Sequence, residues 1–148
     1  MHIQFLFGTE TGTAEIVCED LQAALGTDHT SAIASLEDVT PDNLDKSHLH
    51  VVVCSTFGSG DLPTTAEVFF DQIKGGAKDL TGVQFAIFGL GDRTFGDTFN
   101  QGSERLAEAL VECKATQVGA RGIADASAGD LPEDIAIPWL KGILNAQD

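Results

Sequence analysis

Residues 2–15 read HIQFLFGTETGTAE. The apolar run at residues 2–7 predicts a buried β-strand that ends at Gly8. Beyond Thr13, apolar residues recur at helical spacing until Gly26; they are Ala14, Val17, Cys18, Leu21 and Leu25. This part of the chain therefore predicts a strand and a helix joined by a loop of glycine, threonine and glutamate.

The same alternation of strand and helix continues along the chain. Further strands are expected at residues 30–36, 49–54, 83–88 and 115–118, and helices at 66–74, 103–113 and from Pro132 onward. In the last helix we expect Pro138 in the first turn, where its missing N–H does no harm. The alternation predicts an α/β fold with an open parallel sheet covered by helices on both faces. We expect a single domain over residues 1–148, because that is an ordinary domain length.

The chain is strongly acidic, with 8 Lys and Arg against 23 Asp and Glu and a formal net charge of −15. Residues 1–45 contain no Lys or Arg, which argues against nucleic-acid binding, because phosphate contacts depend on these cations. An acidic surface can steer a basic protein partner, although a gain in solubility explains the charge equally well.

The three cysteines, Cys18, Cys54 and Cys113, form no CxxC pair and have no zinc-like spacing with histidine. We therefore expect free buried thiols and no metal site. No apolar run approaches the ~20 residues of a membrane span, and no basic leader precedes the first strand. These features predict a cytoplasmic protein without a membrane segment.

Ligands of open parallel sheets bind beyond the carboxyl ends of the strands, so the loops there form the candidate site. The first loop, residues 8–15, enters a helix N-terminus, where N–H groups and the helix dipole attract anions. Thr9, Thr11 and Thr13 add hydroxyl donors, and the absence of Lys excludes a nucleoside-triphosphate loop. The pattern favours a phosphate site over a plain helix cap.

The loops after the third and fourth strands are rich in glycine and contain aromatic residues. They read STFGSGDLP at residues 55–63 and GLGDRTFGDTFN at residues 89–100. Phe57 and Phe95 are candidates for two walls of a flat slot, because a planar ring gains burial and stacking energy between aromatic faces. A loop that tucks its phenylalanine into the core is the commoner structure for either loop alone. Together with the first loop, they indicate a mononucleotide with a planar ring system.

Taken together, the three loops resemble those of the flavodoxin family, especially its short-chain, MioC-like branch and the FMN domains of diflavin reductases. Residues 130–140, DLPEDIAIPWL, resemble the same branch. The resemblance implies a flavodoxin-like three-layer sandwich, with a five-stranded parallel sheet of order 2-1-3-4-5, and a non-covalent FMN. The FMN-binding residues that it implies are Thr9, Glu10, Thr11, Gly12, Thr13, Ala14, Ser55, Thr56, Phe57, Gly58, Leu90, Gly91, Asp92, Phe95, Thr98, Phe99 and Asn100. Such relatives carry an acidic residue near the flavin after the fifth strand, for which Asp125 and Ser127 both remain open.

The resemblance also implies a monomeric electron carrier rather than an enzyme. Such a carrier would take electrons from a flavin or ferredoxin-type reductase and pass them singly to a haem-thiolate monooxygenase or another terminal acceptor. The MioC-like features leave a second hypothesis open, a flavin-binding accessory protein that supports another enzyme. A phosphoacceptor receiver domain is disfavoured, because Cys54 and Ser55 stand where its aspartate is needed.

Overall fold

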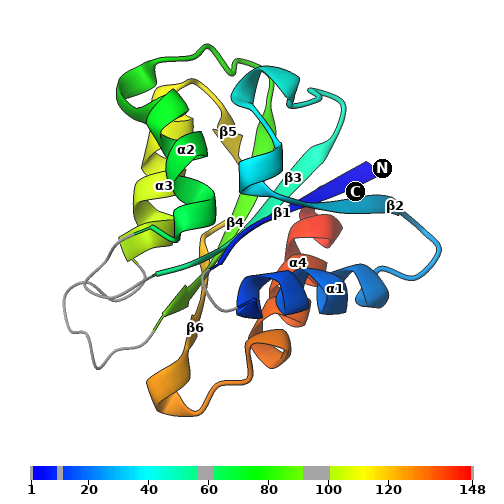
Figure 1. Cartoon of the computed structure of the whole chain (residues 1–148). Helices are drawn as coiled ribbons and strands as arrows, with labels where there is room; N and C mark the ends of the chain where they lie inside the picture. The colour runs from blue at the N-terminus through cyan, green and yellow to red at the C-terminus, as the bar shows by residue number, and fades with distance from the viewer. Residues whose placement is uncertain (1, 10–11, 57–61, 92–100, 148) are drawn as a thin grey trace.

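The computed structural model describes residues 2–9, 12–56, 62–91 and 101–147. A central sheet separates two layers of helices (Figure 1). The helices are α1 (Thr13–Ala24) and α4 (Pro132–Gln147) on one face, and α2 (Thr64–Ile73) and α3 (Gln101–Glu112) on the other. The predicted three-layer α/β architecture is confirmed.

The strand order agrees with the prediction. The strands are β1 (His2–Gly8), β2 (Thr30–Ser35), β3 (Leu49–Ser55), β4 (Gln84–Gly91), β5 (Thr116–Gln117) and β6 (Gly122–Asp125). Within the described residues they pair in parallel in the order β2-β1-β3-β4-β5, and β6 also pairs with β4. Of the fifth strand predicted at residues 115–118, only Thr116–Gln117 is a strand, and β6 forms the larger part of that edge of the sheet.

A close approach of backbone to aromatic rings explains why β6 begins at Gly122. A Cβ at this position would lie 2.4 Å from Phe88 Cδ2 and 2.9 Å from Trp139 Cδ1. The same tryptophan donates a hydrogen bond of 2.9 Å from Nε1 to the Ala120 carbonyl. The connection between β5 and β6 is thus fixed to α4, and only glycine lets β6 reach β4 there.

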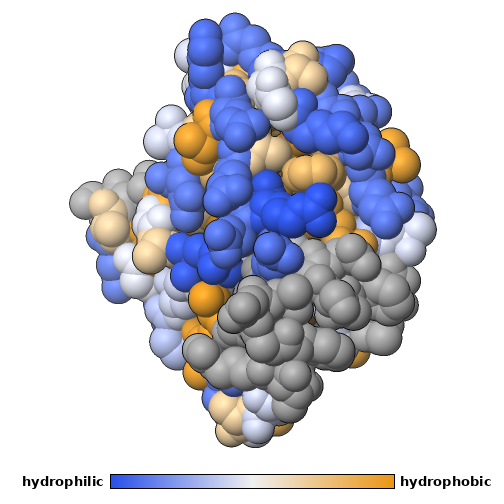
Figure 2. All heavy atoms as spheres, turned by 90° about the vertical axis from the view of Figure 1, so that its left-hand side faces the viewer, coloured by the Kyte–Doolittle hydropathy of each residue, from blue (hydrophilic) through white to orange (hydrophobic). Residues whose placement is uncertain are grey.

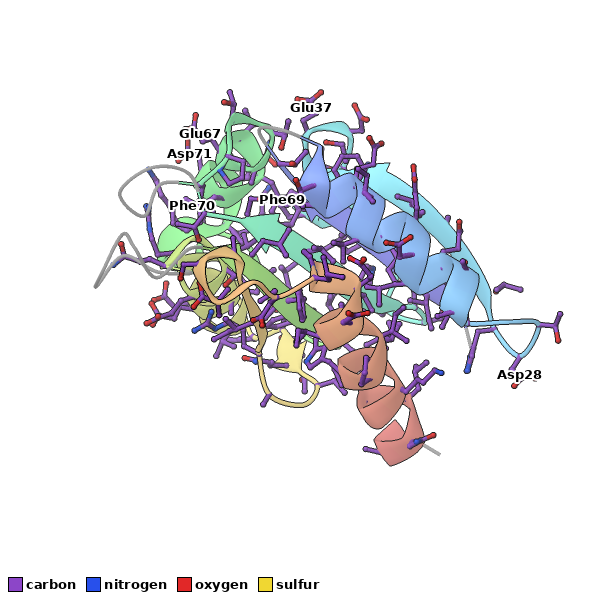
Figure 3. The ribbon with its side chains drawn as sticks, turned by 90° about the horizontal axis from the view of Figure 1, so that it is seen from below. Asp28, Glu37, Glu67, Phe69, Phe70 and Asp71 are labelled. Carbon is purple, nitrogen blue, oxygen red and sulfur yellow. The ribbon has the colours of Figure 1, made fainter. Side chains whose placement is uncertain are left out.

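Side chains of the central strands alternate between two cores, as successive residues of a strand must. Phe5, Val51 and Phe88 pack under α1 and α4, whereas Leu6 and Val52 pack under α2 and α3. Burial on both faces explains why these strands read as unbroken apolar runs. In α2, Phe69 points toward the sheet, while Glu67 and Asp71 point away from it (Figure 3).

The expectation for Pro138 was wrong, because this residue lies in the second turn of α4. Proline at that position removes the N–H that would bond to the Asp134 carbonyl. Pro138 is exposed, but Ala136 and Leu140 on either side of it are buried in the core. Packing of the helix against the sheet therefore outweighs the local defect. In the described part of the chain, no helix is long and apolar enough to cross a membrane.

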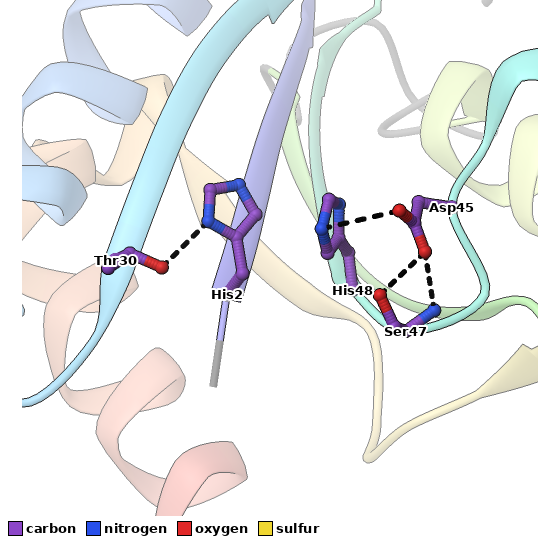
Figure 4. Close-up of polar contacts among 5 residues, drawn as sticks. All are labelled: His2, Thr30, Asp45, Ser47 and His48. Carbon is purple, nitrogen blue, oxygen red and sulfur yellow. Dashed lines mark hydrogen bonds and ion pairs between the residues drawn. The ribbon is translucent and has the colours of Figure 1, made fainter.

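Histidines gather at the amino edge of the sheet, opposite the candidate loops (Figure 4). His2 Nδ1 lies 2.8 Å from Thr30 Oγ1, and the ring centroids of His2 and His48 are 4.2 Å apart. Asp45 Oδ1 accepts hydrogen bonds from the Ser47 N–H and hydroxyl, and Asp45 Oδ2 lies 3.5 Å from His48 Nε2. These contacts join the turn before β3 to the start of β1.

Burial lowers the pKa of His50 below its ordinary value of 6.5, and the neighbouring His48 and His2 lower it further. The Gln84 carbonyl, which accepts a hydrogen bond from His50 Nδ1, and Asp45 oppose this shift of the pKa. The unfolded chain therefore binds this proton more readily than the folded chain does. We expect the free energy of unfolding to fall as the pH drops from 6.5 toward the lowered pKa. His50→Asn, which keeps a donor for the Gln84 carbonyl, should flatten this dependence in urea unfolding curves. A variant with the wild-type pH dependence would contradict the prediction.

Candidate functional site

The carboxyl ends of β1, β3 and β4 lie side by side (Figure 1). Gly8 is the register partner of Cys54, and Cys54 is the partner of Gly89. On the outer side of β4, Gly91 is paired with Asp125 of β6. The chain therefore leaves these strands at one edge of the sheet, as the sequence predicts.

The structure places part of the predicted FMN-binding set at this edge. The described members are Thr9, Gly12, Thr13, Ala14, Ser55, Thr56, Leu90 and Gly91. Nine other members lie outside the described residues: Glu10, Thr11, Phe57, Gly58, Asp92, Phe95, Thr98, Phe99 and Asn100. The contact of each residue with FMN stays a prediction.

The first loop leads directly into the N-terminus of α1. Gly12 is the N-cap residue, with φ 91° and ψ −4°, a left-handed conformation that favours glycine. Its N–H donates a hydrogen bond of 2.9 Å to Thr9 Oγ1, which joins the residue after β1 to the start of α1. The Ala14 side chain is fully buried, so only the backbone of this residue is available to the loop. N–H groups of a 12-residue helix and neutral hydroxyls are a donor set that suits a phosphate monoester.

The second loop begins at Thr56, which joins the ends of two strands to α3. The Thr56 N–H donates to the Leu90 carbonyl at 2.9 Å, and Thr56 Oγ1 accepts from the Gly102 N–H at 3.1 Å. A Cβ on Gly102 would lie 3.1 Å from both the Ser55 carbonyl oxygen and Thr56 Oγ1, so glycine permits this approach. The Leu90 side chain is buried in the core beneath α1 and α4. The part of Leu90 at this edge is therefore its backbone, whose carbonyl accepts the hydrogen bond from Thr56.

Arg121 holds the first turn of α3 from the other side. Its Nη1 donates a hydrogen bond of 2.8 Å to Ser103 Oγ, and its Nη2 lies 3.8 Å from Glu104 Oε2. The sequence analysis missed Gly102, Ser103 and Arg121 as parts of the site's support. A Gly-Ser pair at the start of a predicted helix was the available signal, whereas no local pattern marks Arg121.

The two candidates for the acidic position after the fifth strand lie in one hydrogen-bonded turn. Asp125 is 5% exposed at the end of β6, and its Oδ1 accepts from the Ser127 N–H at 3.0 Å and hydroxyl at 2.7 Å. The Asp125 N–H donates to Asp130 Oδ2 at 3.1 Å. Asp125 and Ser127 thus bond to each other beside Gly91, and this turn forms the outer border of the edge.

The thiol beneath the first loop is chemically inert. Burial raises the pKa of the Cys54 thiol to about 12, so it is protonated at neutral pH. Cys54 Sγ donates a hydrogen bond of 3.3 Å to the Ser55 carbonyl. Nucleophilic chemistry by this thiol is therefore disfavoured. Among the described residues, no cluster of His, Cys, Asp and Glu is arranged to hold a metal ion.

Comparison with known proteins agrees with this geometry. The family model described as flavodoxin matches residues 5–139. NADPH-dependent diflavin oxidoreductase 1 of Emericella nidulans is 35% identical over 141 residues, which cover 93% of this chain and 21% of that protein. The chain thus spans about a fifth of the length of this relative.

Two further relatives match this chain over nearly their whole length. The MioC homolog of Haemophilus influenzae is 31% identical over 144 residues, with 97% of each chain covered. A solved structure of a cysteine-to-serine mutant of flavodoxin from Pseudomonas aeruginosa has a TM-score of 0.83 and 29% identity, and covers 99% of this chain and 98% of that one. The family match over residues 5–139, together with these relatives, shows that the chain belongs to the flavodoxin family, whose members carry electrons on FMN.

Proposed function

We propose that FMN binds at the carboxyl edge of β1, β3 and β4, with its phosphate at the N-terminus of α1 and its ring between the second and third loops. The main observation behind this proposal is that the three strands end side by side, with Gly8, Cys54 and Gly89 in register. When bound, FMN supplies transfer of one or two electrons. The residues of the chain bind the cofactor, orient it and set the charge around it.

Backbone and hydroxyl donors hold the phosphate in this proposal. The Thr9–Gly12 hydrogen bond joins the end of β1 to the N-cap of α1. The first N–H groups of a helix have no acceptor within it, and in this proposal those of α1 bind the phosphate. Thr13 begins this helix and adds a hydroxyl. Phe57 and Phe95 form the proposed walls of the ring site. Both lie outside the described residues, so this part of the proposal rests on the sequence.

The protein acts as a monomeric electron carrier between a flavin or ferredoxin-type reductase and a haem-thiolate monooxygenase or another terminal acceptor. Charge around the edge supports this role. The first turns of the four α-helices contain acidic residues: Glu15, Glu67, Glu104, Glu133 and Asp134. Hydrophilic side chains dominate the α2–α3 side of the molecule (Figure 2), where the basic Lys74 and Arg105 lie beside Glu67 and Asp71. The first-turn carboxylates are the negative charges that steer basic partner faces toward the proposed cofactor site. The free, buried thiols suit the reducing cytoplasm, which we propose as the site of action.

A flavin-binding accessory protein is the second candidate. The full-length similarity to the MioC homolog favours it, because that relative has the same extent as this chain. The two functions differ in kinetics. A carrier exchanges electrons with a reductase rapidly and repeatedly, whereas an accessory protein changes the activity of another enzyme without such turnover.

A pair of glycine variants tests the phosphate position. Gly12 and Gly26 lie at the two ends of α1 with φ of 91° and 68°, and a Cβ at either would meet no described atom within 4 Å. Alanine at each position should therefore cost about 1–2 kcal/mol of stability through backbone strain alone. We expect only Gly12→Ala to weaken FMN binding, measured by quenching of FMN fluorescence with apoprotein. Equal affinities of the two variants would place the phosphate elsewhere.

The absorbance spectrum of the purified protein and an anaerobic reductive titration provide the direct test of the cofactor. We expect flavin bands and reduction in two separable one-electron steps. A colourless protein that takes up no added FMN would leave only the fold and overturn the proposed function.

Matched charge variants test the docking surface. Glu67 lies in the first turn of α2, whereas Asp28 lies in the connection between α1 and β2, far from the candidate edge (Figure 3). Each of Glu67→Gln and Asp28→Asn removes one negative charge. In stopped-flow mixing with a basic ferredoxin-type reductase, we expect Glu67→Gln to slow electron transfer roughly twofold at low salt and Asp28→Asn to leave it unchanged. A wild-type rate that does not depend on salt would instead favour the solubility explanation of the charge.

A further inference from the structure

A pair of hydrogen bonds ties the first loop to the start of α2. The Thr9 N–H donates to Thr65 Oγ1 at 2.9 Å, and the Thr65 hydroxyl donates to the Thr9 carbonyl at 3.1 Å. One hydroxyl can accept and donate at once, so a single side chain satisfies both backbone groups of Thr9. The two residues are 56 positions apart in the chain. No local sequence pattern brings them together.

The bonds of Thr65 lead directly to the proposed phosphate position. The backbone of Thr9 is held by Thr65, and the side chain of Thr9 accepts the hydrogen bond from the Gly12 N–H. Gly12 in turn is the N-cap of α1, and its carbonyl accepts the first helical bond from the Ile16 N–H at 3.2 Å. A change at Thr65 therefore reaches the N-terminus of α1 through two intervening residues, Thr9 and Gly12.

Thr65 does not serve its own helix in the usual way. It is the second residue of α2, and the N-cap residue of that helix, Pro63, makes no side-chain cap. Threonine near a helix start commonly bonds to a neighbouring backbone group, but the Thr65 hydroxyl bonds to the N–H and the carbonyl of Thr9 in the first loop. The adjacent Ala66 lies against the end of β1, where a Cβ on Gly8 would be only 2.9 Å from the Ala66 Cβ. The first turn of α2 thus packs against the end of β1 and holds the start of the first loop by hydrogen bonds.

We infer that Thr65 is a positioning residue for the phosphate of the cofactor, which rests on the proposed FMN site. Its hydroxyl fixes the backbone of Thr9, and through Thr9 the N–H of Gly12, so that the start of α1 is held in place before the ligand arrives. Preorganised donors bind more tightly, because the ordering cost is met on folding.

Three variants separate positioning from general stability. Thr65→Val removes the hydroxyl while keeping the shape, and Thr65→Ser keeps the hydroxyl. Thr30→Val is the matched control, because the Thr30 hydroxyl also contacts a residue distant in sequence, His2 Nδ1, but at the opposite, amino edge of the sheet. We expect Thr65→Val to bind FMN about tenfold more weakly, the effect of two ordinary hydrogen bonds. Its affinity for riboflavin, which lacks the phosphate, should stay at the wild-type value. Thr65→Ser and Thr30→Val should keep the wild-type ratio of the two affinities.

Amide hydrogen exchange of the apoprotein gives a readout that needs no FMN. We expect the Thr9 and Gly12 N–H groups to exchange faster in Thr65→Val and at the wild-type rate in Thr65→Ser. Equal losses of FMN and riboflavin affinity, or an unchanged FMN affinity, would overturn the inference. If the wild-type protein binds no FMN, while Thr65→Val still exchanges faster at Thr9 and Gly12, the proposed function and the role of Thr65 toward phosphate are both overturned. Only the structural link between Thr65 and the first loop would then remain. If Thr65→Val does not fold, Thr65→Ala provides the same comparison.

Discussion

Parallel pairing of β1, β3 and β4 is the constraint on which the candidate site depends. These strands are buried on both faces, so their backbone groups bond to neighbouring strands, and each connection has to return over a helix. The register that aligns Gly8, Cys54 and Gly89 then forces the chain to leave all three strands at one edge. A ligand site made of segments far apart in the sequence follows from this pairing, whichever residues the loops contain.

Hydrogen bonds of neutral hydroxyls hold the described part of this edge together. Thr9, Thr56 and Thr65 each bond through Oγ1 to the backbone of a loop or of a helix start. Such bonds respond little to ionic strength, whereas attraction between an acidic surface and a basic partner decays over about 8 Å at physiological salt. On the proposed function, the cofactor site and the docking surface lie at the same edge, but ionic strength affects partner docking much more than it affects the shape of the cofactor site.

The sequence predicts the parts of the structure that depend on long apolar runs. The central strands, the helices and the strand order follow from runs such as residues 49–54 and from the family resemblance. The division of the fifth strand into β5 and β6 could not be predicted, because both are too short for a periodic pattern. Their separation depends on the close approach of the Gly122 backbone to the Phe88 ring. Thr65 was not predicted either. A threonine at the start of a helix looks ordinary, and its partner at Thr9 is revealed only by the packing of α2 against β1.

Acidic residues in first turns stabilise helices through the helix dipole, so their presence in α1 to α4 does not by itself indicate a partner. The same dipole favours Lys and Arg near helix C-termini, and Lys74 caps α2 in this way, whereas the last turns of α1, α3 and α4 contain no basic residue. Helix stability therefore accounts for only part of the distribution of charge. A chain with a net charge of −15 repels acidic surfaces on average, including copies of itself. On the proposed function, this repulsion favours encounters with basic partners. The first-turn carboxylates then attract the basic face of a partner to the edge where the cofactor is proposed to bind.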